Sequence, residues 1–219
     1  MNHSRKKVSA SSSRWLQRDR RDAYVKAAAR EGYRSRSAYK LVEINERFGF
    51  LRKGSKVVDL GAAPGGWSQV AAKRVGARKG LERVVAVDVL EMEPISGCRV
   101  LRAEFPAVDL SAKVLEALDG RVNVVLSDML ANVSGNRLVD YQRSLELCRN
   151  VEAFASGGVL ASGGTLCCKL LRGGDGADEK EMLADWRKRF DSITRFKPKA
   201  SRGESAEIYL VASGFCGLP

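Results

Sequence analysis

Three ionisable residues flank predicted strands, at positions where an open α/β sheet collects its functional groups. Asp128 follows one apolar run, Lys169 ends a second, and Glu207 begins a third. A lysine within an apolar strand is costly to bury unless it is paired or takes part in chemistry. The pattern therefore favours a reactive polar site. The alternative for Lys169 is a structural lysine whose amine reaches solvent.

A glycine turn between a predicted strand and a predicted helix indicates a ligand. The stretch 57–69 reads Val-Val-Asp-Leu-Gly-Ala-Ala-Pro-Gly-Gly-Trp-Ser-Gln. Gly61, Gly65 and Gly66 let the backbone turn sharply and approach a ligand, because no Cβ stands in the way. A helix that starts there directs free N–H groups toward an anionic group. The stretch therefore predicts a site for a nucleotide-like cofactor.

The glycine spacing does not match a dinucleotide site. Ala63 stands where the pattern G-x-G-x-x-G requires its second glycine. The stretch instead resembles the first motif of S-adenosylmethionine (SAM) methyltransferases, and the carboxylate of SAM suits a helix N-terminus. Asp88 ends the next predicted strand, where a carboxylate accepts the hydroxyls of a ribose. Since NAD folds use the same placement, a dehydrogenase is the alternative at this point.

The chain is basic, and the charge is concentrated at its start. It carries 38 Lys and Arg against 26 Asp and Glu, and residues 1–56 hold 16 of the basic and 5 of the acidic side chains. Aromatic residues are interleaved with these basic residues at Trp15, Tyr24, Tyr33 and Tyr39. This combination favours a surface that binds the phosphates of a nucleic acid. The alternatives are a solvated tail and a transit peptide at the acid-free start of the chain.

The remaining composition limits the class of protein. No run of about 18 uncharged apolar residues is present, so we expect no transmembrane helix. The five cysteines are scattered and the single histidine is His3, so we expect no metal and no disulfide framework. We expect a monomeric protein of the reducing cytoplasm, with the mitochondrial matrix as the alternative.

Strands alternate with helices from residue 55 onward, which predicts βαβ units and a mostly parallel sheet. The expected strands are 56–60, 83–88, 99–104, 122–127, 164–171, 193–197 and 207–213. The expected helices are 66–76, 107–118, 137–156 and 177–190, preceded by helices around 23–29 and 35–44. The fold class is therefore α/β, with flanking helices on a seven-stranded sheet.

We divide the chain into a basic N-terminal RNA-binding extension, residues 1–35, and a catalytic domain, residues 36–219. Residues 1–13 are polar and rich in serine, so we expect them to be disordered until a partner orders them. On this division, deleting residues 1–35 should lower RNA affinity and leave SAM affinity nearly intact.

Several stretches together resemble the RrmJ/FtsJ family of SAM-dependent ribose 2′-O-methyltransferases over nearly the whole chain. They are 11–16, 33–41, 59–69, 127–129, Lys169 and 201–209. The resemblance implies a Rossmann-like class I methyltransferase fold. It also implies methylation of a uridine ribose in large-subunit rRNA, within the assembling ribosomal subunit. It is greatest to the bacterial heat-shock type, which acts on 23S-type rRNA.

The resemblance also implies the site residues. The catalytic tetrad falls on Lys40, Asp128, Lys169 and Glu207. The SAM contacts fall on Gly61, Gly65, Trp67, Asp88, Glu104 and Asp128. Two positions depart from the family pattern: Glu104 replaces the usual Asp beside the adenine, and 129–132 reads Met-Leu-Ala-Asn in place of Met-Ala-Pro-Asn.

A ribose 2′-OH is a weak acid, so the protein must align it with the methyl group and remove its proton. We expect Lys169 to act as the general base, with Asp128 orienting it and offsetting the sulfonium charge. Lys40 and Glu207 would position the hydroxyl. In the alternative, Lys169 stays charged and only steers an oxygen lone pair. Rival functions are a dehydrogenase, an RNA-binding assembly factor without activity, and a tRNA or mRNA-cap ribose methyltransferase.

Overall fold

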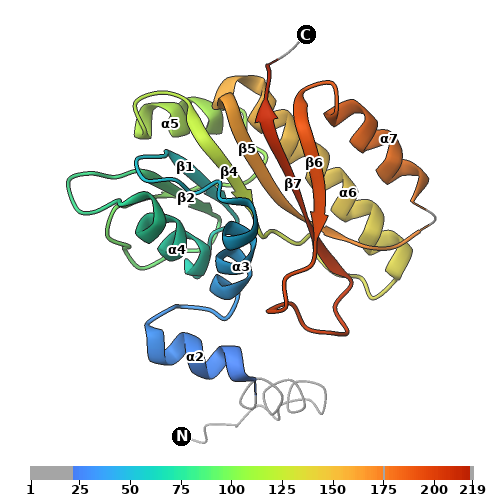
Figure 1. Ribbon diagram of the computed structural model, residues 1–219, viewed down its shortest axis with the longest axis horizontal. Coiled ribbons are helices and arrows are strands. Elements are labelled where there is room, and N and C mark those ends of the chain that lie inside the picture. The colour runs from blue at the N-terminus through green and yellow to red at the C-terminus, as the bar shows by residue number, and fades with distance from the viewer. Residues whose placement is uncertain (1–21, 175, 218–219) are drawn as a thin grey trace, which may run out of the picture.

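Seven strands form one sheet in the order β3-β2-β1-β4-β5-β7-β6 in the part of the chain that the structure describes (Figure 1). The structure is a computed structural model, and it describes residues 22–174 and 176–217. The strands are β1 (Val57–Leu60), β2 (Val84–Asp88), β3 (Cys98–Arg102), β4 (Val122–Ser127), β5 (Leu160–Leu171), β6 (Phe190–Phe196) and β7 (Glu207–Phe215). The helices are α2 (Ala23–Glu31), α3 (Ala38–Phe48), α4 (Gly66–Val75), α5 (Leu110–Ala117), α6 (Arg137–Phe154) and α7 (Ala177–Trp186), with a π-helical turn at Ala155–Val159.

The sheet is parallel except at β7. β7 pairs antiparallel with β5 on one side and with β6 on the other, whereas the pairs among β3, β2, β1, β4 and β5 are all parallel. The first residue of β7 therefore lies at the same edge as the last residues of the parallel strands. This arrangement confirms the predicted seven-stranded, mostly parallel α/β sheet, and it brings Glu207 to the edge where β4 and β5 end.

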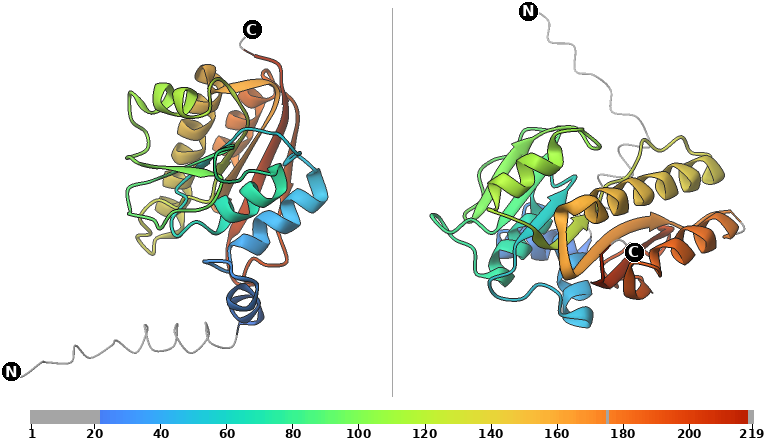
Figure 2. Two further views of the ribbon diagram at one scale, coloured as in Figure 1. Left: turned by 90° about the vertical axis from the view of Figure 1, so that its left-hand side faces the viewer. Right: turned by 90° about the horizontal axis from the view of Figure 1, so that it is seen from above.

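Helices cover both faces of the sheet, so its central strands are buried on both sides. The left-hand view of Figure 2 shows α5 and α6 on one side and α3 and α4 on the other. Successive strand residues alternate between the two cores: Val125 packs with α5 and α6, whereas Val124 packs with α3 and α4. Burial on both faces explains why the strands read as continuous apolar runs.

Several element boundaries differ from the sequence-based prediction by up to four residues, among them those of β5 and α7. β5 begins at Leu160, four residues before the predicted start. Gly163 has a φ of 76°, and the register between β4 and β5 shifts between the Val122–Leu160 and Val124–Thr165 pairs. α7 ends at Trp186 because Phe190 already begins β6. These two differences leave Lys169 and Glu207 on their strands, whereas β3 ends at Arg102, so that Glu104 follows the strand and does not end it.

Helix α2 lies beyond the edge at which the parallel strands end (Figure 1). Gly32 ends it in the left-handed conformation, as the sequence indicated. Asp22, which caps its start, pairs with Arg36, and the Arg36 guanidinium donates to Ala200 O in the β6–β7 loop. Tyr24 donates to Glu43 of α3 at 3.2 Å. The predicted disorder of residues 1–13 lies outside the described residues.

Candidate active site

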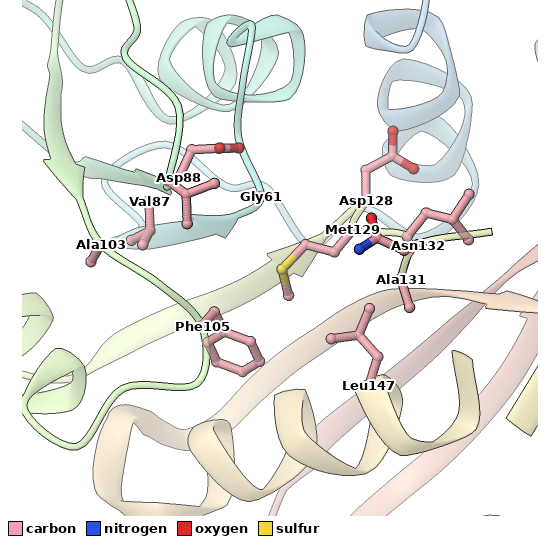
Figure 3. A pocket seen from close by; sticks show the side chains of 12 residues that line it. Gly61, Val87, Asp88, Ala103, Phe105, Asp128, Met129, Ala131, Asn132 and Leu147 are labelled. Carbon is pink, nitrogen blue, oxygen red and sulfur yellow. The ribbon is translucent and has the colours of Figure 1, made fainter. Parts of the chain in front are cut away.

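A cavity of about 570 Å³ opens at the carboxyl ends of β1, β2 and β4, next to the segment that follows β3 (Figure 3). The chain leaves β1 toward β2 on one side and returns as β4 on the other, and open α/β sheets bind ligands at such a switch point. The lining residues are Gly61, Val87, Asp88, Val89, Ala103, Phe105, Asp128, Met129, Leu130, Ala131, Asn132 and Leu147. The volume suits a ligand of nucleoside size.

The glycine turn at the end of β1 leaves no room for side chains. Gly61 has a φ of 70°, and a Cβ there would lie 2.1 Å from the Met129 side chain. Gly65, at a φ of 110°, precedes the first turn of α4, and a Cβ on it would lie 2.6 Å from Ile95. Figure 3 shows Met129 reaching toward the middle of the cavity. Both glycines are therefore required by backbone conformation and by close approach.

Asp88 holds the glycine turn against β2. Its Oδ2 accepts the Ala63 N–H at 2.9 Å, and its Oδ1 accepts the Leu90 N–H at 2.9 Å. A carboxylate has about four acceptor positions, so both oxygens keep room for a further donor. Asp88 lines the cavity and thus remains able to accept ribose hydroxyls while it fixes the loop.

The other predicted SAM contacts differ in their access to the cavity. Trp67 is only 2% exposed and lies outside the lining; its indole donates to Ser37 O at 2.9 Å. Gly65 is buried and also lies outside the lining. Glu104 is exposed and stands between Ala103 and Phe105, which both line the cavity. Direct contact of these three residues with SAM stays a prediction.

Lys169 and Asp128 form an ion pair beside the cavity. The Lys169 ammonium donates to Asp128 Oδ1 at 3.1 Å and also to the Asp128 backbone oxygen. Lys169 is 8% exposed, so its charge is partnered at the point where it leaves the apolar strand. Asp128 also lines the cavity and therefore belongs to both parts of the site.

Lys40 and Glu207 form a second ion pair, at 2.6 Å. Tyr209 connects the two pairs: its hydroxyl donates to Asp128 Oδ1 at 2.6 Å, and Lys40 Nζ lies 5.8 Å from the centre of its ring. We call Lys40, Asp128, Lys169, Glu207 and Tyr209 the ion-pair cluster. The structure thus brings together all four predicted tetrad residues.

The strand register explains this assembly. Tyr209 pairs with Lys169, and Glu207 pairs with Leu171, across the antiparallel β5–β7 ladder. Because side chains two residues apart share a face, Lys169, Glu207 and Tyr209 project from the same side of the sheet. That side is covered by α3, whose buried Leu41 packs there and brings the neighbouring Lys40 to the cluster.

Tyr209 was not predicted as a site residue. It is fully buried within an apolar strand and resembles a core aromatic, with Trp67 packed 5.5 Å from it between ring centres. Burial raises the pKa of Tyr209 well above its ordinary value, as do Asp128 and Glu207 close by, so the phenol stays protonated and donates. A signal in the sequence is its spacing of two residues from Glu207, which places both on one face.

Asp59 is a second carboxyl behind the glycine turn. It is 1% exposed, and its Oδ2 accepts the Ser68 hydroxyl at 2.7 Å, which joins β1 to α4 across the turn. Burial raises the pKa of Asp59 to about 7, against the lowering effect of the Ser68 bond, and Asp128 and Asp88 raise it further. Asp59 therefore titrates near neutrality.

Within residues 22–174 and 176–217, no group of three or more His, Cys, Asp and Glu side chains is arranged to hold a metal ion. Over the same ranges no helix combines the length and apolar character needed to cross a bilayer.

Comparison with known proteins places the chain in a family. The model of the FtsJ-like methyltransferase family matches residues 33–215. A ribosomal RNA large subunit methyltransferase E from Parvibaculum lavamentivorans is 48% identical, over 97% of this chain and 85% of the relative. One from Xanthobacter autotrophicus is 46% identical, over 94% of this chain and 80% of the relative.

A solved structure of a ribosomal RNA methyltransferase from Plasmodium falciparum has the same architecture. It matches with a TM-score of 0.72 at 28% identity, over 85% of this chain and 100% of that chain. Since the family model spans the cavity and the ion-pair cluster alike, the chain belongs to the FtsJ-like methyltransferase family.

Proposed function

We propose that the protein transfers a methyl group from SAM to the 2′-hydroxyl of a uridine ribose in large-subunit rRNA. The observation that carries the proposal is that Asp128 belongs both to the cavity lining and to the ion-pair cluster. It lines the cofactor cavity, and it also accepts bonds from Lys169 and Tyr209 in the ion-pair cluster. One carboxylate therefore stands between a donor site and a site that can handle a hydroxyl group.

The cavity fits SAM in shape and in charge. Asp88, which lines the cavity, supplies acceptors for ribose hydroxyls. The amino end of α4 follows the glycine turn outside the lining, and we propose that its N–H groups receive the carboxylate. Asp128 places a negative charge beside the cavity, where it offsets a sulfonium cation. When bound, SAM supplies an electrophilic methyl group. Gly65, Trp67 and Glu104 are proposed as further contacts.

The ion-pair cluster handles the acceptor hydroxyl. Lys169 takes the 2′-OH proton as general base, while Asp128 orients its amine through two oxygens. Tyr209 holds Asp128 in place through its hydroxyl. The Lys40–Glu207 ion pair positions the ribose of the acceptor. A lysine must be neutral to accept a proton, whereas an arginine stays charged. Lys169→Arg therefore removes the general base but keeps a cation that can steer an oxygen lone pair.

The names of the relatives and the basic start of the chain both support large-subunit rRNA as the substrate. Two relatives, at 46% and 48% identity, are named ribosomal RNA large subunit methyltransferase E. Residues 1–56 carry a strong excess of basic side chains, and Lys26 and Arg30 are exposed on α2 beyond the catalytic edge. We propose that this extension binds rRNA phosphates of the assembling subunit in the cytoplasm, and that the protein acts as a monomer.

The test is transfer of a tritiated methyl group from SAM to unmethylated large ribosomal subunits, followed by mapping of the methylated nucleotide. Label on a uridine 2′-oxygen of the large-subunit rRNA supports the proposal. If instead only tRNA or an mRNA cap becomes labelled in parallel reactions, the protein is a tRNA or mRNA-cap ribose methyltransferase. Binding of subunits without any transfer would make the protein an assembly factor.

A further inference from the structure

The connection between α2 and α3, residues 32–37, is bonded to the first turn of α4. The Arg34 N–H donates to Gln69 Oε1 at 2.8 Å, and Gln69 Nε2 donates to Gly32 O at 2.9 Å. At the other end of the connection, Ser37 O accepts the Trp67 indole N–H at 2.9 Å. The connection, which we call the strap, is therefore held to α4 at both of its ends.

The Arg34 side chain extends this attachment to two loops. Its Nη1 donates to Pro64 O at 3.2 Å and to Glu93 O at 2.7 Å, and its Nη2 donates to Pro94 O at 2.8 Å. Pro64 lies in the glycine turn, whereas Glu93 and Pro94 lie in the β2–β3 loop. A planar guanidinium can reach several acceptors at once, which a lysine ammonium cannot do in the same geometry.

The glycine turn is thus held from two sides. Asp88, which lines the cofactor cavity, accepts the Ala63 N–H on one side, and Arg34 binds the Pro64 carbonyl on the other. The strap also lies directly on the turn, because a Cβ on Gly66 would stand 2.3 Å from Ser35 Oγ. The shape of the cofactor loop therefore depends on where the strap lies.

Packing of Tyr33 against Tyr39 and the core holds the strap on its inner side, and polar bonds hold it beside a space on its outer side. A second cavity of about 430 Å³ runs along it, lined in part by Tyr33, Arg34 and Gln69. A segment beside such a space has room to move when its polar bonds are broken. On its amino side the strap continues into α2, whose Lys26 and Arg30 are exposed.

We propose that Arg34 is a positioning residue that couples binding of RNA on α2 to binding of SAM at the glycine turn. The inference rests on the proposed function, because it requires an RNA acceptor. RNA bound to α2 restrains the strap, and the restrained strap keeps the turn in its ligand-binding shape. By thermodynamic linkage, SAM then tightens RNA binding by the same factor.

The test measures this coupling factor in the full-length protein. S-adenosylhomocysteine serves as the probe, because it has no methyl group to transfer and the complex stays unreacted. Its Kd is measured by calorimetry without RNA and with saturating large-subunit rRNA. In the wild type we expect RNA to lower the Kd by about fivefold or more, which is the lower end of typical coupling. In Arg34→Lys the factor falls to about 1.

Arg30→Ala is the matched control. Arg30 is an exposed basic residue on α2, and it pairs with the neighbouring Glu31 at 3.3 Å. Its loss weakens RNA binding but leaves the coupling factor at saturating RNA unchanged. A wild-type factor in Arg34→Lys would overturn the inference, and so would a factor of about 1 in the wild type.

Two further measurements separate coupling from simple loss of structure. Gln69→Leu removes the two bonds that Gln69 makes to Gly32 and Arg34 and keeps that of Trp67 to Ser37. It lowers the coupling factor as well, so the inference does not depend on one variant that must fold. In steady state, Arg34→Lys raises the KM for SAM and keeps kcat at saturating SAM. If methyl transfer fails in the wild type while RNA still lowers the Kd, the proposed function is wrong and the coupling stands.

Discussion

The glycine turn beside the cofactor cavity is shaped by backbone conformation, whereas the ion-pair cluster is held together by side chains. Around the cavity, Gly61 and Gly65 allow the turn, and Asp88 accepts main-chain N–H groups. In the cluster, Lys40 meets Glu207 and Lys169 meets Asp128 across four different elements. Changes at the cavity should therefore act on ligand affinity, and changes in the cluster on turnover. Four substitutions test this contrast.

The largest effect is expected at Lys169. Lys169→Ala should lower kcat for RNA methylation by roughly 10²–10⁴-fold, the usual contribution of a general base. The Kd for SAM should change little, because Lys169 does not line the cavity. Single-turnover methyl transfer at saturating SAM measures the step. Lys169→Arg should be as impaired as Lys169→Ala. A near-normal rate for the arginine variant would contradict the general-base role and show that Lys169 only steers an oxygen lone pair.

The next effect is expected at Gly61. In Gly61→Ala the new methyl group meets the Met129 side chain at a φ of 70°. Overpacking of this kind costs about 1–3 kcal/mol, so SAM affinity should fall about tenfold or more. Calorimetry with SAM measures it, and kcat at saturating SAM should be nearly normal.

Gly80→Ala is the control for this change. Gly80 has a φ of 77° with open space around its Cβ position, so it carries similar backbone strain without the contact. Equal loss of SAM affinity in both variants would mean that strain alone, and not the approach of Met129, matters.

A smaller effect is expected at Tyr209. Tyr209→Phe removes one bond to Asp128 and keeps the packing against Trp67. Hydrogen bonds to charged groups contribute about 1.5–3 kcal/mol, so kcat should fall about tenfold while the Kd for SAM stays constant. Tyr24→Phe is the control, because Tyr24 also donates to a carboxylate, Glu43, away from the cluster. A change confined to SAM affinity would contradict the division between the two regions.

The smallest effect on activity is expected at Asp59, where stability is the readout. Burial raises its pKa from 3.8 to about 7, so the folded state keeps this proton to higher pH than the unfolded state does. The free energy of unfolding should therefore fall between about pH 4 and pH 7, by at most about 1.4 kcal/mol per pH unit, and then level off.

Asp59→Asn should remove this dependence on pH. Urea unfolding at pH 5, 6, 7 and 8 measures it, with Asp185→Asn, at an exposed carboxylate, as the control. Parallel pH profiles in the wild type and in Asp59→Asn would show that Asp59 does not titrate in this range.

The same contrast explains what sequence could predict. The glycine turn, Asp88 and Asp128 were predictable because a contiguous strand-turn-helix pattern determines local geometry. Tyr209 was missed because its role arises from antiparallel pairing with Lys169, which no local pattern reveals. Arg34 is one of many arginines in a basic segment, and only the fold shows that it binds three backbone carbonyls.

The strap also bears on the boundary at residue 35. Residues 32–35 contact the glycine turn and α4, so a deletion of 1–35 would remove Arg34 together with the basic extension. The expected separation of RNA affinity from SAM affinity applies better to a deletion that ends before Gly32. The charge pattern alone could not show this, because it does not distinguish an arginine facing solvent from one facing a loop.

The antiparallel insertion of β7 also sets an order of events during synthesis. Chains emerge from the amino end, and contacts between residues distant in sequence form late. Every residue that lines the cofactor cavity has been synthesised once the chain reaches Leu147, whereas Lys40 gains its partner only when Glu207 of the last strand is made. The residues of the cavity lining are therefore all present in the growing chain before the ion-pair cluster can be completed, and the acceptor chemistry is withheld until β7 has paired with β5.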